Sequence, residues 1–102
     1  MSEKSSVKRI SVGDAKSMIG AEDVHIVDIR DSQSFNIDHL SQAQNITGAN
    51  AEDFVKTAQK DKPLLIYCYH GNSSPIAGKF FLENGFADVY SIEGGFEKIR
   101  SK

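Results

Sequence analysis

The sequence predicts an α/β fold, in which a mainly parallel β-sheet has helices packed against both of its faces. Short apolar runs alternate along the chain with segments whose apolar residues recur every three to four positions. The short runs are typical of buried strands, and the longer spacing is typical of amphipathic helices. Strands that alternate with helices form βα units, and such units build a sheet that is mainly parallel.

Three segments have the composition of buried strands, and two more have weaker strand patterns. The stronger segments are residues 24–29, 64–67 and 89–92, which are rich in β-branched and aromatic side chains. The weaker ones are residues 43–46 and the residues around Ile10. We expect all of them to lie in one sheet.

The first two predicted helices follow residues that favour helix N-termini. Ser11 caps a segment with Val12 and Ala15 on one face, and Gly20 marks the expected end of this helix. Asn50 caps a second helix, which we expect to run to about residue 60.

The last two predicted helices lie in the C-terminal third of the chain. The third begins near Pro75, because proline is favoured at the first helical position, and ends at Gly85 in a left-handed cap. A short fourth helix starts at Gly95. In the third helix the residues expected to face the core are Ile76, Ala77, Phe80 and Phe81.

Size and charge limit what the chain is expected to bind. Its 102 residues suit one domain, and we expect a flexible N-terminus over residues 1–6 and a single domain over 7–102. With 12 basic and 14 acidic residues the net charge is -2, and without a basic run we expect no nucleic-acid partner. Neither a secretory signal nor a membrane-length apolar stretch is visible, so we expect a cytoplasmic monomer without membrane contact.

Cys68 is the single cysteine of the chain. It therefore cannot form an intramolecular disulfide or belong to a zinc site built from several cysteines. The three histidines lack close ligand spacing, so we expect neither a metal nor another cofactor. Ligands of open α/β sheets bind beyond the carboxyl ends of strands, and Cys68 directly follows the most apolar predicted strand. This position favours a reactive thiol over an inert buried one.

The segment after Cys68 has the composition of an anion-binding loop. It reads Cys68-Tyr69-His70-Gly71-Asn72-Ser73-Ser74 and leads into the third predicted helix. Successive backbone N–H groups in such a loop, together with the start of a helix, form a concavity for anions and favour a thiolate. The alternative is an ordinary strand-to-helix turn capped by a serine.

Three segments of the chain resemble the motifs of the single-domain rhodanese family, and specifically its GlpE-type thiosulfate sulfurtransferase branch. The loop Cys-Tyr-His-Gly-Asn-Ser-Ser is similar to the active-site loop of that branch. Upstream, residues 27–35 with His39 are similar to the first rhodanese signature, and downstream residues 89–96 are similar to the second. The resemblance as a whole spans roughly residues 10–99.

The resemblance implies a five-stranded sheet and a reaction. Cys68 would be the nucleophile that takes sulfur from thiosulfate as a persulfide and passes it to cyanide in assays or to a thioredoxin-like dithiol in cells. The backbone of the loop would bind the sulfur and its small-molecule donor. The residues implied as structural support are Asp28, Arg30, Gly94 and Gly95, with the first two forming an ion pair that fixes two loops together. His39 would close the turn after Phe35.

One position departs from the wider rhodanese pattern. Many rhodaneses carry arginine or lysine five residues after the cysteine, where this chain has Ser73. A hydrogen bond from a neutral hydroxyl is weaker than one from a charged group. We therefore expect weak thiosulfate binding.

Two other functions are compatible with parts of this pattern. A cysteine phosphatase or arsenate reductase uses a similar strand–loop–helix unit, but residues 68–74 lack the arginine that grips a phosphoryl group. A rhodanese-like binding module without activity would typically lack the cysteine, whereas this chain keeps Cys68. The sulfurtransferase is therefore the favoured prediction.

Overall fold

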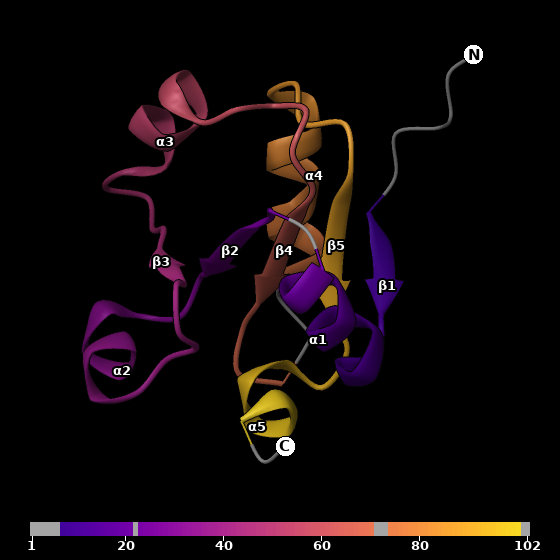
Figure 1. The fold of residues 1–102 in the computed structure, drawn as a ribbon. Helices are drawn as coiled ribbons and strands as arrows, with labels where there is room; N and C mark the ends of the chain where they lie inside the picture. The colour runs from indigo at the N-terminus through magenta and orange to yellow at the C-terminus, as the bar shows by residue number, and fades with distance from the viewer. Residues whose placement is uncertain (1–6, 22, 71–73, 101–102) are drawn as a thin grey trace.

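The computed structural model describes residues 7–21, 23–70 and 74–100 of the chain. Its five strands are β1 (Lys8–Ile10), β2 (His25–Asp28), β3 (Gln44–Asn45), β4 (Leu64–Tyr67) and β5 (Val89–Ile92). They form one sheet in the order β1-β5-β4-β2-β3, and every pair of neighbours is parallel (Figure 1). The predicted fold class is thus confirmed. The predicted N-terminal segment, residues 1–6, lies outside the described residues.

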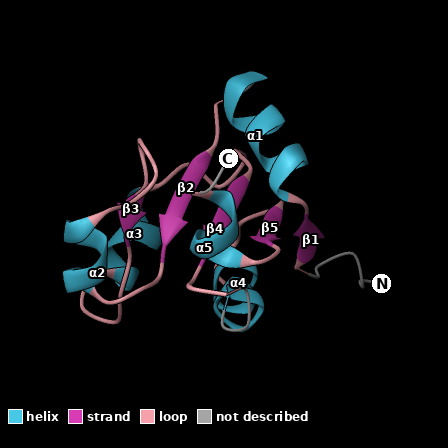
Figure 2. Ribbon diagram, turned by 90° about the horizontal axis from the view of Figure 1, so that it is seen from below, coloured by secondary structure: helices cyan, strands magenta, loops and turns pink. Residues whose placement is uncertain are grey.

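Two hydrophobic cores lie on opposite faces of the sheet. The helices are α1 (Val12–Ala21), α2 (Ser32–Ile37), α3 (Ala51–Thr57), α4 (Ser74–Glu83) and α5 (Gly95–Ile99). One core joins α1 and α5 to Leu65 and Tyr67 of β4, and the other joins α3 and α4 to Leu64 and Ile66 (Figure 2). Successive side chains of a strand point to opposite faces, so β4 supplies both cores in turn.

Strand β4 is the centre of the molecule. All four of its residues are 0% exposed, and the strand pairs with β2 on one side and β5 on the other. Its continuous apolar sequence is what a strand buried on both faces requires. The residue that follows β4 is Cys68, so a fully buried strand leads directly to the predicted nucleophile.

The helix boundaries differ from the predictions at three places. Gly20 was expected to end the first helix, but α1 continues through it to Ala21. Helix α3 ends at Thr57 instead of near residue 60, because Ala58 is already extended. Asn50 does precede α3, yet its side-chain oxygen accepts a hydrogen bond from the Thr47 N–H instead of capping the helix.

Helix α4 matches its predicted ends, and its predicted inner face differs at one residue. Gly85 has φ +104, and the bonds Gly85 N–H to Leu82 O and Phe86 N–H to Phe81 O form a Schellman cap. Phe81 is buried as expected, but Ile76 is 76% exposed, so the prediction that it faces the core was wrong. Ile76 lies in the first turn of α4.

Helix α2 was not predicted from the sequence. It starts after Asp31, whose carboxylate accepts a hydrogen bond from the Ser34 N–H at 3.0 Å, a regular N-cap. None of its six residues is buried, so the segment carries no apolar periodicity that would reveal a helix.

Among the described residues, no helix has both the length and the apolar character needed to span a membrane.

Candidate active site

Cys68 lies where the chain leaves the core at the carboxyl end of β4. The preceding Tyr67 is fully buried, Cys68 is 6% exposed, and Tyr69 is 45% exposed. Cys68 is therefore buried, between the fully buried end of β4 and the exposed Tyr69. The next described element is α4, which begins at Ser74.

The predicted anion-binding loop is described only in part. Cys68, Tyr69 and His70 are described, and Ser74 is the first residue of α4. The other predicted loop residues, Gly71, Asn72 and Ser73, lie outside the described residues.

The backbone of the cysteine segment is hydrogen-bonded to α5. The Phe96 N–H donates to the carbonyl oxygen of Cys68 at 2.7 Å, and the Glu97 N–H donates to that of Tyr69 at 3.2 Å. Helix α5 follows Gly94 and begins at Gly95, which have φ values of +82 and +65. The two glycines predicted as structural support therefore lie at the turn that places the start of α5 beside Cys68 and Tyr69.

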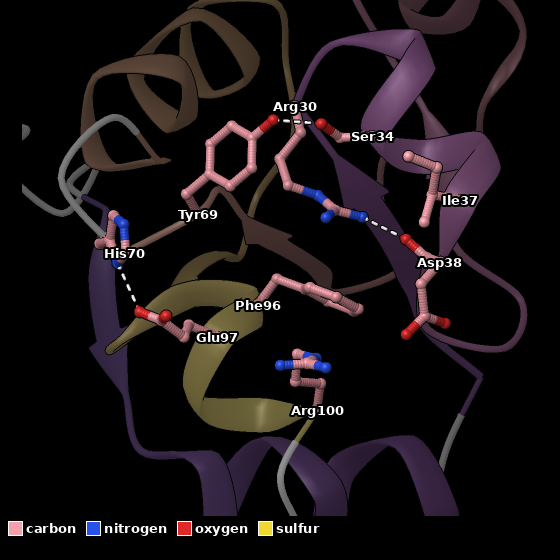
Figure 3. Close-up of a pocket in the computed structure, with 9 residues that line it drawn as sticks. All are labelled: Arg30, Ser34, Ile37, Asp38, Tyr69, His70, Phe96, Glu97 and Arg100. Atoms are coloured by element: carbon pink, nitrogen blue, oxygen red, sulfur yellow. Dashed lines mark hydrogen bonds and ion pairs between the residues drawn. The ribbon is translucent and has the colours of Figure 1, made fainter.

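The Tyr69 side chain connects the cysteine segment to α2. Its hydroxyl donates to Oδ1 of Asp31 at 2.6 Å and also contacts Oγ of Ser34 (Figure 3). The hydrogen bond from Tyr69, with those from Ser34, lowers the pKa of Asp31 from 3.8 to about 2. The carboxylate at this helix start thus remains ionised across the physiological range and holds the Tyr69 ring.

His70 forms an exposed contact with α5. Its Nδ1 lies 2.8 Å from Oε1 of Glu97, and both side chains are more than half exposed. An exposed pair of this kind contributes little to stability.

Arg30 is the centre of a buried cluster beneath this surface. Its guanidinium binds both carboxylate oxygens of Asp28, with Nη2 2.7 Å from Oδ2, and it donates to the Asp38 carbonyl at 2.6 Å. Its Cζ also lies 4.0 Å from the centre of the Phe96 ring. Burial opposes its charge, but the hydrogen bonds and charge of Asp28 outweigh burial and raise the pKa of Arg30.

The arrangement of this ion pair differs in one respect from the expectation. Asp28 and Arg30 do pair, but they lie two residues apart on one segment, with Asp28 as the last residue of β2. The Asn45 side-chain amide donates to the carbonyls of Asp28 and Arg30, and the Arg30 guanidinium faces the rings of Tyr69 and Phe96. Cation–π contacts with aromatic rings on other segments thus accompany the pair.

His39 lies where α2 ends. Its Nδ1 is 2.7 Å from the Phe35 carbonyl oxygen, and its ring stacks on that of Phe35 with centroids 3.8 Å apart. These contacts agree with the expected role of closing the turn after Phe35.

A hollow of about 380 Å³ opens between α2, α5 and the cysteine segment (Figure 3). Its lining combines apolar and charged side chains: Arg30, Ser34, Ile37, Asp38, Tyr69, His70, Phe96, Glu97 and Arg100. The sequence motifs did not reveal four of these residues, because they come from separate segments and lie outside the motifs: Ile37, Asp38, Glu97 and Arg100. In the part of the chain that is described, no cluster of three or more metal-ligating side chains occurs.

Comparisons with known proteins agree with this geometry. A thiosulfate sulfurtransferase GlpE from Pseudomonas aeruginosa is 50% identical over 76 residues, which cover 74% of this chain and 69% of that protein. The protein of the same name from Shewanella oneidensis is 47% identical over 92 residues, which cover 90% of this chain and 91% of that protein.

A solved structure with the same fold comes from Rhodopseudomonas palustris. It is described as a protein of unknown function and possible tyrosine phosphatase, with a TM-score of 0.79 and 30% identity. The match covers 93% of this chain and 80% of that one. The family model described as Rhodanese-like domain matches residues 11–102. The chain therefore belongs to the rhodanese-like domain family.

Proposed function

We propose that this protein is a thiosulfate sulfurtransferase in which Cys68 carries sulfur as a persulfide. The observation that carries the proposal is the position of Cys68 at the carboxyl end of the central strand β4, between the core and the start of α4. The relatives named thiosulfate sulfurtransferase support the choice of donor.

The first half of the reaction is attack on the donor. The Cys68 thiolate forms a bond to the outer sulfur of thiosulfate, and the sulfur–sulfur bond of thiosulfate breaks. Sulfite leaves with the bonding electron pair, and Cys–S–S⁻ remains. Backbone N–H groups from Tyr69 to Ser74 are the proposed donors that stabilise this anion, because fixed dipoles stabilise charge without reorganising.

The second half returns the thiolate. Cyanide attacks the terminal sulfur and leaves as thiocyanate, or a dithiol reduces it. In the latter case the dithiol is oxidised to a disulfide, the carried sulfur leaves as hydrogen sulfide, and Cys68 is regenerated. We propose a thioredoxin-like dithiol protein as the cellular acceptor, and with it a cytoplasmic site of action, where reducing conditions keep such thiols available. The monomer is the proposed working form.

Intact mass spectrometry tests the proposed reaction directly. Treatment with thiosulfate is expected to add the mass of about one sulfur atom to the wild-type chain. Cyanide or dithiothreitol should remove that mass, and Cys68→Ser should never gain it. A wild-type chain that gains no mass and releases no sulfite on treatment with thiosulfate would overturn the proposal.

A phosphatase is the second candidate, because the related solved structure is described as a possible tyrosine phosphatase. The sequence of residues 68–74 contains no arginine, and Arg30 nearby is already bound to Asp28. Phosphoryl transfer depends on a guanidinium that grips the oxyanion, so we expect no turnover of p-nitrophenyl phosphate. Turnover that disappears in Cys68→Ser would favour the phosphatase instead.

A further inference from the structure

The start of α5 is the described element that directly holds the backbone carbonyl of the nucleophile. The N–H groups of Phe96 and Glu97 donate to the carbonyls of Cys68 and Tyr69 at 2.7 and 3.2 Å. The first N–H groups of a helix have no partner within the helix, so they are available for such bonds. Two successive peptide groups of the cysteine segment are thereby fixed in orientation.

The orientation of these carbonyls determines where the adjoining N–H groups point. In a planar trans peptide the C=O and the N–H of the next residue point in opposite directions. Because the Cys68 and Tyr69 carbonyls point toward α5, the N–H groups of Tyr69 and His70 point away from it. These are the first two donors of the proposed sulfur-binding backbone.

The close approach of α5 leaves no room for a side chain at its first residue. A Cβ atom on Gly95 would lie 2.6 Å from the Cys68 carbonyl oxygen and 2.6 Å from the carbonyl carbon and oxygen of Tyr69. Such distances force the backbone of the cysteine segment to move. Gly95 also has φ +65, a conformation that side chains disfavour.

We propose that Gly95 is a positioning residue, which lets the N–H groups of Phe96 and Glu97 orient the Tyr69 and His70 N–H groups for the thiolate and the persulfide of Cys68. The inference rests on the proposed function, since it assigns the device that aims the sulfur-binding donors. It predicts that a side chain at Gly95 impairs thiol ionisation and sulfur transfer more than it impairs folding.

Gly94 provides a matched control one residue earlier. It also has positive φ, at +82, and a Cβ there would crowd three carbons of the Lys98 side chain at 2.6–3.2 Å. Gly94→Ala therefore imposes similar strain on the start of α5, but it does not push on the backbone of Cys68 or Tyr69. Comparison of Gly95→Ala with Gly94→Ala therefore separates two effects: misorientation of the Tyr69 and His70 N–H groups, and backbone strain at the start of α5.

The experiment measures alkylation of Cys68 by iodoacetamide across pH, together with steady-state thiosulfate turnover. For Gly95→Ala we expect the pH midpoint of alkylation to rise and kcat/KM to fall at least tenfold below the Gly94→Ala value. That is the size expected when a hydrogen bond to a charged group is lost. The melting temperatures of both variants, measured by circular dichroism, show how much the backbone strain lowers the stability of each.

The results separate the positioning role of Gly95 from the proposed sulfurtransferase activity on which it rests. Equal alkylation profiles and equal kcat/KM in the two variants would overturn the positioning role, while wild-type turnover would leave the sulfurtransferase proposal intact. Wild-type chain that forms no persulfide would overturn the function itself.

A backbone variant decides the case in which Gly95→Ala does not fold. An ester in place of the amide between Gly95 and Phe96 removes only the N–H that donates to the Cys68 carbonyl, and it adds no atoms near Tyr69. We expect this ester to raise the pH midpoint of alkylation and to lower kcat/KM. An ester variant with the wild-type profile would contradict the proposal.

Discussion

Tyr69 is the residue through which the cysteine segment meets α2. Its side chain is 45% exposed, yet its hydroxyl is held by the Asp31 carboxylate at 2.6 Å. The ionised carboxylate is in turn stabilised by the Ser34 N–H at the start of α2. An exposed tyrosine can therefore have a defined orientation next to the nucleophile.

The low pKa of Asp31 gives the first prediction. Tyr69→Phe removes the largest cause of the shift, so the pKa of Asp31 should rise from about 2 toward 3.8 while the Ser34 hydrogen bonds keep it below that value. Because the folded-state pKa is lowered, this stabilisation is complete above the pKa of the unfolded chain and is lost as the pH falls toward about 2.

Carboxyl chemical shifts followed by NMR across pH measure this titration. Tyr90→Phe is the control, because Tyr90 lies on β5 beside Lys8 and not near Asp31. An Asp31 titration that is the same in Tyr69→Phe and in the wild type would refute the predicted coupling.

The buried pair of Asp28 and Arg30 gives the second prediction. Asp28 is 0% exposed, so Arg30→Met leaves a buried carboxylate without its cation. Breaking a buried pair in this way costs about 3–5 kcal/mol of unfolding free energy. Urea denaturation measures the loss, and the double variant Asp28→Asn with Arg30→Met should recover part of it. A single variant within about 1 kcal/mol of wild type would show that the Asp28 carboxylate is satisfied without Arg30.

At the level of single elements, two glycines that both follow an apolar helical pattern have different roles: one lies inside its helix and the other ends its helix. Gly20 lies inside α1, and a Cβ there would meet nothing within 4 Å. Gly85 ends α4 with φ +104, where it closes the Schellman cap. The sequence pattern predicted a helix stop at both, but only Gly85 has the left-handed conformation of one.

These conformations give the third prediction. Gly20→Ala should raise the unfolding free energy by about 0.5–1 kcal/mol, because alanine restricts the unfolded chain and favours a helix interior. Gly85→Ala should lower it by about 1 kcal/mol or more, because alanine resists positive φ. Urea denaturation of both variants measures the two changes in unfolding free energy. A Gly85→Ala variant more stable than the wild type would contradict the role of Gly85 as a helix cap.

Helix α2 shows why some elements escape prediction from sequence. Its six residues bury nothing, so the helix is specified by the Asp31 cap and by its contacts with Tyr69 and Arg30. Those contacts join residues up to 38 positions apart in the sequence. Local patterns cannot report such partners.

At the scale of the whole molecule, stability is concentrated in the middle of the sheet. Strand β4 is hydrogen-bonded to strands on both sides and buried on both faces. Strand β1 lies at the edge, pairs with β5 alone, and has two exposed residues among its three. We therefore expect the strand before the nucleophile to open last.

Hydrogen exchange tests this distribution and gives the fourth prediction. Amide protons of Leu65 and Ile66 should exchange through global unfolding. The Ile10 amide faces β5, because the Ile10 carbonyl accepts from the Glu93 N–H, and it should exchange through local opening with a lower free energy. NMR-detected exchange at several urea concentrations measures both opening free energies. The free energy of global opening falls with urea, whereas that of local opening hardly changes. Equal protection of Ile10 and Leu65 would show that the edge opens only with the whole sheet.

The sequence by itself determined the α/β class, the three main strands and the place of Cys68 after the most apolar one. These features follow from local periodicity and from general rules of parallel sheets, which need no knowledge of distant contacts. The tertiary structure alone decided which groups surround the cysteine segment: the N–H groups of α5 on its carbonyls and Asp31 on Tyr69. These contacts join residues 28 to 38 positions apart, and only the folded chain brings such distant residues together.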